Sequence, residues 1–436
     1  MNNVPNRFPA RLMDLYSDHQ AQFNEMMIQL EMEFDKELDA ERLAKAVDLT
    51  LDAEPILGCR FVDKSYKPFF ERLDVNKRPA FFLTNSQNEY ETFKTRSIDH
   101  KTGPQINVCL WHSPNGDWLL LKSSHHVADA AGIKDIVAIL SGTYRRLSDD
   151  PAYRPSPNIK EQRSFREILK HVPLHAYLVI FLLSLRTQWV GYFPPPIHAL
   201  YTSDGPREPL VYVNHLIPSD RVSTMVKYSH SHNATLNDII TAAAFRALAT
   251  MGNRKKGSHI TFATTIDLRR YIPSGRVPSV ANLSYMYMCW PDIGAELDKD
   301  FKSTLGKVAK ITRHRKEHWI GLDLIFETFN PMCKVMSHAQ AKKIYREYME
   351  SLIKKQTGTH WFTNIGPIDT ESVNFGIQPS KAHFLPPVAY PPGPCMFSLS
   401  GYNGTLTLSA GTYPTQKEIV EKFFDAILKE LRFRWE

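Results

Sequence analysis

The chain has 436 residues, of which 43% are hydrophobic and 23% are charged, with a formal net charge of +7. This length exceeds one ordinary hydrophobic core and predicts two domains, while the average composition argues against disorder or a fibrous repeat. The 53 basic residues form no long block, so a nucleic-acid-binding class is not indicated. The scattered cysteines form no CxxC pair, which argues against a zinc site or a disulfide framework, and no metal is expected. The N-terminus lacks the apolar run of a signal peptide, so a cytoplasmic protein is expected.

The first 150 residues alternate between strand and helix patterns. Four segments are rich in apolar and β-branched residues and are expected to be strands: 23–34, 56–63, 105–112 and 116–124. Apolar residues recur every three or four positions in 38–55 and 131–147, which predicts two helices with one buried face each. A strand-to-helix junction therefore lies near residue 125, and such junctions place side chains at the open edge of a sheet, where clefts form.

Residues 174–185, "LHAYLVIFLLSL", form the most apolar run of the chain that is expected to be helical. The run is shorter than the roughly 18 to 20 apolar residues that a helix needs to span a bilayer. Two alternatives remain: a helix buried in the core or at a domain interface, and a helix that lies on a membrane surface.

Proline and turn residues gather in 191–209, which is interpreted as a linker between domains 1–190 and 210–436. The second domain has its own mixture of elements. Strands are expected at 211–218, 259–268, 283–290, 360–366 and 394–413, and helices at 235–252, 298–314, 335–355 and 415–431. Strands and helices are mixed without strict βαβ alternation, so we expect an α/β (α+β) sandwich rather than a doubly wound sheet.

The junction near residue 125 reads "SSHHVADAAG" and places His125 four residues before Asp129. A neutral imidazole can take a proton from a hydroxyl or amine as that group attacks a carbonyl, which is the work of a general base. No GxSxG nucleophile motif is present, so direct transfer to an activated acceptor is simpler than a covalent intermediate. Asp129 could orient His125, or it could pair with an arginine such as Arg269 or Arg270 at the end of a second-half strand.

The segment "SHHVADAAG" resembles the HxxxD motif of BAHD acyltransferases and the HHxxxDG motif of condensation domains from nonribosomal peptide synthetases. His125 stands in the catalytic position of that motif and Asp129 in the structural one. Other segments are similar to this superfamily in the same order along about residues 38–414: "LDAERLAKAVDLTLDAEPILGCRF", "ATLNDIITAAAFRALA", "TTIDLRR", "SVANLS", "FTNIGPID" and "SLSGYNGTLTLSAGTY".

The resemblance implies two chloramphenicol-acetyltransferase-like domains in a V, with His125 in a central tunnel that a thioester donor and an acceptor enter from opposite faces. Some positions depart from the pattern. Ser124 replaces the first histidine, Ala130 and Ala281 replace glycines, and "NFG" stands where a DFGWG segment is expected. These departures disfavour both the peptide-bond-forming and the plant BAHD assignments and leave a stand-alone acyltransferase.

Several other residues are candidates for the site around His125, and some of them have a structural alternative. Thr363 and Asn364 are candidates for stabilising an oxyanion or positioning substrate, with ordinary turn chemistry before Gly366 as the alternative. Ser124 is a further positioning candidate, and Asn282 and His126 are expected at the tunnel. His126 should point away from His125 if the backbone is extended there, and it is then expected to pack structurally. His230 and His232 are interpreted as part of a solvated loop before a helix rather than as metal ligands.

The leading functional hypothesis is transfer of an acyl group from a CoA or carrier-protein thioester to a hydroxyl or amine, with no bound cofactor. The alternative is a non-catalytic, condensation-like module that binds a carrier protein or a lipid. A carrier protein is expected to act in trans, since no carrier domain is recognised in the sequence. Contact with a membrane through residues 174–185 is compatible with either function.

Overall fold

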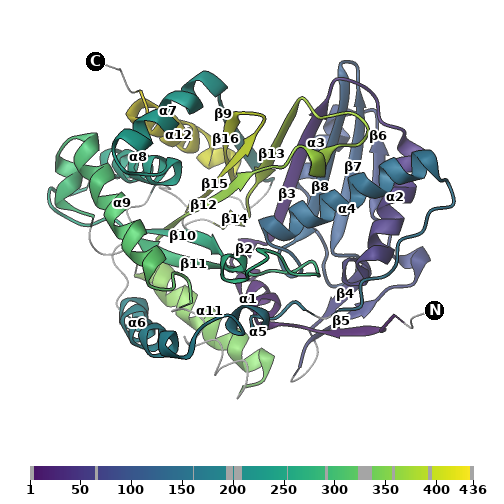
Figure 1. The fold of residues 1–436 in the computed structure, drawn as a ribbon, viewed down its shortest axis with the longest axis horizontal. Coiled ribbons are helices and arrows are strands. Elements are labelled where there is room, and N and C mark those ends of the chain that lie inside the picture. Colours follow the sequence, from purple (N-terminus) through teal and green to yellow (C-terminus); the bar gives the residue numbers. More distant parts are fainter. Residues whose placement is uncertain are drawn as a thin grey trace.

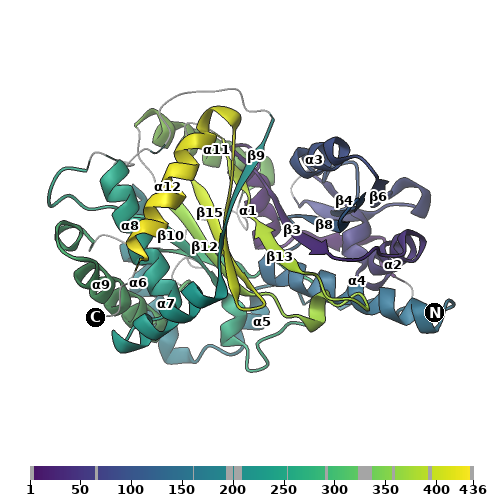
Figure 2. The same ribbon diagram turned by 90° about the horizontal axis from the view of Figure 1, so that it is seen from above.

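The computed structural model describes residues 4–63, 67–160, 162–192, 200, 209–252, 254–289, 293–322, 336–355, 359–390 and 395–432. Two large mixed sheets, each covered by helices, make up most of this structure, and they lie side by side in both views (Figures 1 and 2). The predicted α/β fold, in which strands and helices are mixed in each half, is therefore confirmed.

The first large sheet carries the HxxxD motif at the end of a central strand. Its strands lie in the order β13 (Lys381–Leu385), β3 (Met27–Phe34), β8 (Gly116–Ser124), β7 (Ile106–Ser113) and β6 (Phe81–Thr84). Helices α2 (Ala40–Ala53) and α4 (Ala130–Asp149) pack on one face, and α3 (Gln87–Thr95) lies on the other. Successive residues of β8 serve both faces, since Leu119 and Leu121 join the core under α2 and α4 while Leu120 joins the core under α3.

The second large sheet has six strands and a separate core. Its order is β11 (Ser284–Cys289), β10 (Phe262–Asp267), β12 (His360–Pro367), β15 (Met396–Tyr402), β16 (Thr405–Thr412) and β9 (Val211–Ile217). The helices whose apolar residues join this core are α7 (Ser219–Ser231), α8 (Leu236–Met251), α9 (Phe301–Glu317) and α12 (Lys417–Glu430). Strand β12 runs parallel to both of its neighbours, β10 and β15.

Smaller elements join the two sheets. Strand β13 follows the second-half strand β12 in sequence but pairs with β3 of the first sheet. Directly after it, β14 (Val388–Ala389) pairs with β2 (Asn24–Glu25), so the chain returns to the second sheet only after two contacts with the first half. The described structure also contains a three-stranded sheet of β1 (Arg7–Pro9), β5 (Phe69–Arg72) and β4 (Cys59–Val62). Outside the sheets lie α1 (Leu12–Gln20), α5 (Arg166–Leu169), α6 (Leu174–Tyr192) and α11 (His338–Lys354).

Most predicted elements are present, and the differences have local causes. The helix predicted at 131–147 is α4, which begins at Ala130 because Asp129 caps it. Helix α7 was not predicted, and it contains His230, whereas His232 lies in the short loop before α8, as expected. The strand predicted at 56–63 begins only at Cys59, since Pro55–Gly58 forms a short 3-10 helix. Most of the predicted linker 191–209 lies outside the described residues.

Helix α6 (Leu174–Tyr192) has one buried face and one exposed apolar face. Ala176, Ile180 and Ser184, four residues apart, are almost fully buried. The opposite face exposes five large apolar side chains: Leu174 (90%), Leu178 (65%), Phe181 (50%), Leu182 (56%) and Leu185 (47%). The prediction of a buried helix therefore holds for one face only. Among the described residues, no helix is both long enough and apolar enough to cross a bilayer.

Candidate active site

His125 lies in the tight turn between strand β8 and helix α4. Its backbone N–H donates to the Met26 carbonyl at 2.9 Å, which extends the pairing between β3 and β8 by one further contact. Its backbone carbonyl accepts hydrogen bonds from Ser17 Oγ at 3.0 Å and from Asn282 Nδ2 at 2.8 Å. The backbone of His125 is thus held on both sides, which fixes the direction of its side chain.

Asp129 ends the turn and begins α4 as its N-cap residue. Its Oδ1 accepts the Gly132 N–H at 2.8 Å, as expected for a capping carboxylate. Its Oδ2 accepts Arg269 Nη1 at 2.9 Å and the Leu283 N–H at 2.8 Å. Burial raises the pKa of Asp129, but the Arg269 charge and these hydrogen bonds outweigh it and lower the pKa overall. Asp129 therefore stays ionised and joins the first sheet to the second.

The structure thus brings Asp129 to Arg269, one of the two arginines considered, and not to the His125 ring. Arg269 follows β10, and its Nη2 also donates to the Ala281 carbonyl at 2.8 Å. Gly132 makes this approach possible, because a Cβ at that position would lie 2.8 Å from the same carbonyl. This requirement for glycine cannot be recognised in the local sequence, since it concerns a segment 149 positions away.

The ring of His125 has one engaged and one available nitrogen. Nδ1 lies 3.1 Å from the Ala128 carbonyl, an acceptor, so Nδ1 carries the proton. The Asn282 amide, 3.1 Å from Nδ1, then donates to the His125 carbonyl rather than to the ring. Within the described part of the chain, only Nδ1 has a hydrogen-bonding partner. Burial is the largest influence on this ring and lowers its pKa, so Nε2 is an unprotonated base at neutral pH.

A cavity of about 980 Å³, part of it open to solvent, borders His125 between the two large sheets. The first half contributes residues near β3 and the start of α4, including Gln20, Ile28 and Lys134. The second half contributes residues of β10, β12 and β15, including Trp361 and Phe397. Apolar walls with a few polar groups are typical of small-molecule sites.

Two threonines bring hydroxyl groups to this cavity from neighbouring parallel strands. Thr363 Oγ1 of β12 lies 2.6 Å from Thr265 Oγ1 of β10. Since one hydroxyl of such a pair donates to the other, one hydroxyl hydrogen remains for a ligand. Thr265 was missed by the sequence analysis, which considered only Thr363 and Asn364. Asn364 also borders the cavity, but its Nδ2 donates to Asn237 Oδ1 at 3.1 Å and its Oδ1 accepts the Gly366 N–H.

The structure places three other candidates away from the cavity surface. Ser124, His126 and Asn282 are not among the described residues that border the cavity. Ser124 Oγ instead contacts His126 Nδ1 at 2.9 Å, on the opposite side of the turn from the His125 ring. This placement corrects the expected positions of Ser124 as a substrate contact and of His126 and Asn282 at the tunnel. Asn282 contacts the site through the His125 carbonyl, to which it donates, and through Ser284, a cavity residue whose Oγ donates to Asn282 Oδ1 at 3.5 Å.

No family model matches the sequence, and no curated protein is similar to it. Solved structures are similar over nearly the whole chain. Polyketide synthase associated protein 5 from Mycobacterium tuberculosis gives a TM-score of 0.67 at 13% identity, covering 98% of this chain and 99% of that chain. The epimerization domain from the third module of tyrocidine synthetase B gives a TM-score of 0.63 at 13% identity, and the match covers 99% of this chain and 98% of that chain. The first condensation domain of the CDA synthetase gives a TM-score of 0.63 at 14% identity, with 97% of this chain and 95% of that chain covered. The chain therefore has the condensation-domain fold.

We predict that Asp129→Ala lowers the free energy of unfolding by about 3 to 5 kcal/mol, since it leaves the buried guanidinium of Arg269 with one fewer carboxylate. Chemical denaturation measures this loss. Asp74→Ala is the matched control, because the Asp74–Lys77 pair is exposed and contributes about 0 to 1 kcal/mol. Equal losses in the two variants would contradict a stabilising role for the buried pair.

Proposed function

We propose that this chain is an acyltransferase that moves an acyl group from a CoA or carrier-protein thioester to a hydroxyl or amine acceptor. The observation that carries this proposal is the His125 ring, which borders the cavity with Nδ1 bound to the Ala128 carbonyl and Nε2 available. This arrangement prepares a neutral imidazole to accept one proton from a bound acceptor. The condensation-domain fold supports the same class of reaction.

In the proposed reaction, Nε2 of His125 takes the proton of the acceptor as its oxygen or nitrogen attacks the thioester carbonyl. The new bond forms a tetrahedral oxyanion, which the free hydroxyl hydrogen of the Thr265–Thr363 pair can stabilise. Collapse of this intermediate breaks the carbon–sulfur bond. The leaving thiolate takes the proton from His125, so the products are the acylated acceptor and a free thiol, and the neutral imidazole is restored.

The position of the cavity supports a donor and an acceptor that arrive separately. His125 comes from the first half, whereas the two threonines come from β10 and β12 of the second sheet. A phosphopantetheine arm, on CoA or on a carrier protein in trans, is the donor that we propose. That the cavity opens at both ends, as a tunnel, is part of this proposal.

We expect His125→Ala to lower the rate of thiol release from acyl thioesters by about 10²- to 10⁴-fold, since the general base is lost. The assay follows thiol release from acyl-CoA, with a panel of alcohols and amines as acceptors. A non-catalytic binding module would show no acceptor-dependent release even in the unmodified protein.

The control for this variant is His171→Ala, which removes an exposed histidine outside the cavity. Circular dichroism and thermal unfolding should be unchanged in both variants. Near-normal turnover of a folded His125→Ala protein would refute the assignment of His125 as the base.

For the hydroxyl pair, we predict that replacing both Thr265 and Thr363 by valine lowers kcat by about 10²- to 10³-fold, the usual cost of losing an oxyanion donor. Single replacements should cost less, because the remaining hydroxyl is released from its partner. Thr264→Val is the control, since the side chain of Thr264 points to the opposite face of β10. A change in KM alone, with kcat preserved, would assign the pair to substrate binding.

The exposed face of α6 supports a second proposal, peripheral association with a membrane that contains anionic lipids. Leu174, Leu178 and Phe181 present apolar area that folding has not covered. Two exposed basic residues, Arg166 and Lys170, lie just before this helix. Lys170 Nζ pairs with both carboxylate oxygens of Glu167, so Arg166 is the one that we propose for contact with the headgroups. A basic side chain next to an exposed apolar helix face is a combination that binds at the surface of a membrane with anionic lipids.

Vesicle co-sedimentation tests this association with neutral and anionic vesicles. The double variant Leu178→Glu/Phe181→Glu should reduce the bound fraction at least about tenfold, since each lost side chain removes more than about 1 kcal/mol of apolar burial. Leu216→Glu is the matched control, because Leu216 is also 53% exposed but lies on β9. Equal binding of all three proteins, or none by the unmodified chain, would refute the proposal.

A further inference from the structure

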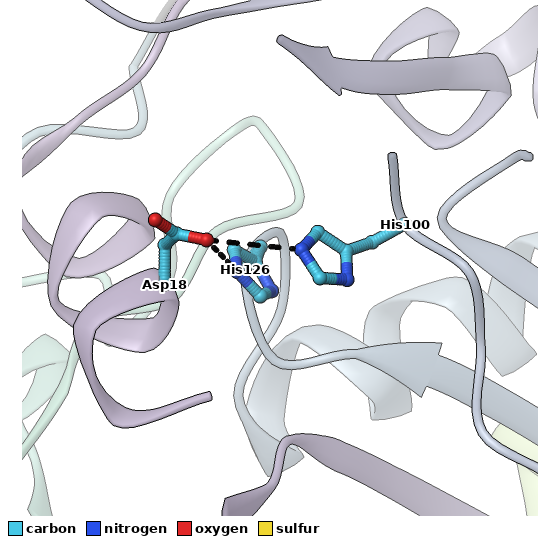
Figure 3. A group of neighbouring side chains, drawn as sticks. All are labelled: Asp18, His100 and His126. Carbon is cyan, nitrogen blue, oxygen red and sulfur yellow. Dashed lines mark ion pairs between the residues drawn. The ribbon is translucent and has the colours of Figure 1, made fainter. Parts of the chain in front are cut away.

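A second cluster of titratable side chains is buried on the other side of the His125 turn. Asp18 of α1, His100 of the loop before β7 and His126 point toward one another (Figure 3). His100 Nε2 and His126 Nε2 each lie 3.9 Å from Asp18 Oδ1, and the three ligand atoms are within 4.8 Å of one another. Asp18 and His126 are each 99% buried, so this is not a solvated surface group.

The Nε2 atom of His126 is buried and has no hydrogen-bonding partner among the described residues, and the same holds for His100 Nε2. Leaving a buried polar atom unpaired is costly, so such an atom calls for an explanation. Ser124 Oγ engages the other nitrogen of His126, which directs Nε2 toward Asp18. Metal-binding histidines are oriented in this way, by a hydrogen bond at the nitrogen that does not bind the ion.

The remaining groups around Asp18 occupy its other oxygen. Oδ2 accepts His338 Nε2 and Lys342 Nζ, both at 2.7 Å, which leaves Oδ1 facing the two rings. Lys101 Nζ is 3.9 Å from Oδ1, but it is 3.1 Å from Asp63 and its side chain is 43% exposed. Asp63 is also held by His338 Nε2 and Lys342 Nζ, each at 3.3 Å, so the exposed Lys101 turns outward alone when a cation binds at Oδ1.

We propose that Asp18, His100 and His126 form a binding site for one Zn²⁺ ion. Two imidazoles and a carboxylate are a ligand set that Zn²⁺ commonly uses, with a fourth position left for water. Bonds of about 2.0 to 2.2 Å require ligand atoms about 3.3 Å apart. The two contacts to Asp18 are 3.9 Å long, and the two rings are stacked with their centroids 4.0 Å apart and their planes at 21°. Binding therefore requires the partly exposed His100 ring to turn out of this stack, so that both Nε2 lone pairs point at the same ion.

A bound ion would connect three segments that otherwise meet through weaker contacts. Helix α1 carries Asp18 and also Ser17, which bonds the backbone of His125. His126 is the neighbour of His125 in the turn. The ion would therefore hold the loop before β7 and α1 against the turn that carries the proposed base, and its role is positional rather than chemical.

The experiment titrates untagged, chelator-treated protein with Zn²⁺ and measures binding by calorimetry and by competition with a chromophoric chelator. We expect one ion per chain, a rise in the unfolding temperature, and tetrahedral-type visible absorption when Co²⁺ replaces Zn²⁺. His126→Gln and His100→Gln should each raise Kd at least about 100-fold, and Ser124→Ala about 10- to 100-fold, as for other groups that orient a ligand.

His314→Ala is the control, because His314, Glu317 and His318 on and next to α9 form an exposed group that could also hold an ion. Loss of binding in this variant with retention in His126→Gln would overturn the proposal, as would absence of stoichiometric binding by the unmodified protein. Should His126→Gln fail to fold, His100→Gln decides the question, since the side chain of His100 is 19% exposed and more easily replaced. None of these measurements depends on acyltransferase activity.

Discussion

The buried ion pair between Asp129 and Arg269 is the contact on which the arrangement of the site depends. Both side chains are almost fully buried, so separating them would leave a charge in a medium of low polarity. Asp129 also caps α4 and accepts the Leu283 N–H, which places the start of that helix against the second sheet. The turn from His125 to Asp129 is thus held at its first residue by β8 and at its last residue by the Asp129–Arg269 pair. Within this turn, the Ala128 carbonyl orients the His125 ring.

Because of this arrangement, the cavity is a product of the contact between the two sheets and not of either sheet alone. His125 comes from the first half, while Thr265 and Thr363 come from the second. Strand β13 strengthens the same contact, since it leaves the second half to pair with β3. A change that shifts one sheet against the other therefore changes the distance between the proposed base and the proposed oxyanion donors, even when no residue of the cavity is altered.

The sequence predicted those features that depend on residues close together in the chain, such as single strands and helices. The apolar run in β8 and the apolar spacing in α4 placed the strand-to-helix junction, and the junction drew attention to His125 and Asp129. Pairings between distant segments were not predictable in the same way. Strand β13 has only five residues, and nothing in them indicates which sheet it joins. Thr265 was missed for the same reason, because its importance comes from a neighbour 98 residues away.

For the two adjacent histidines, the sequence predicts the directions of the side chains but not their surroundings. The rule that neighbouring side chains of an extended backbone point to opposite sides separates His125 from His126, but it does not reveal what His126 meets there. Asp18 and His100 are distant in sequence and have no motif spacing, so only the fold brings them together. The same turn therefore serves two environments: a cavity that the His125 ring borders, and a buried polar cluster where the His126 ring faces Asp18 in the proposed cation site.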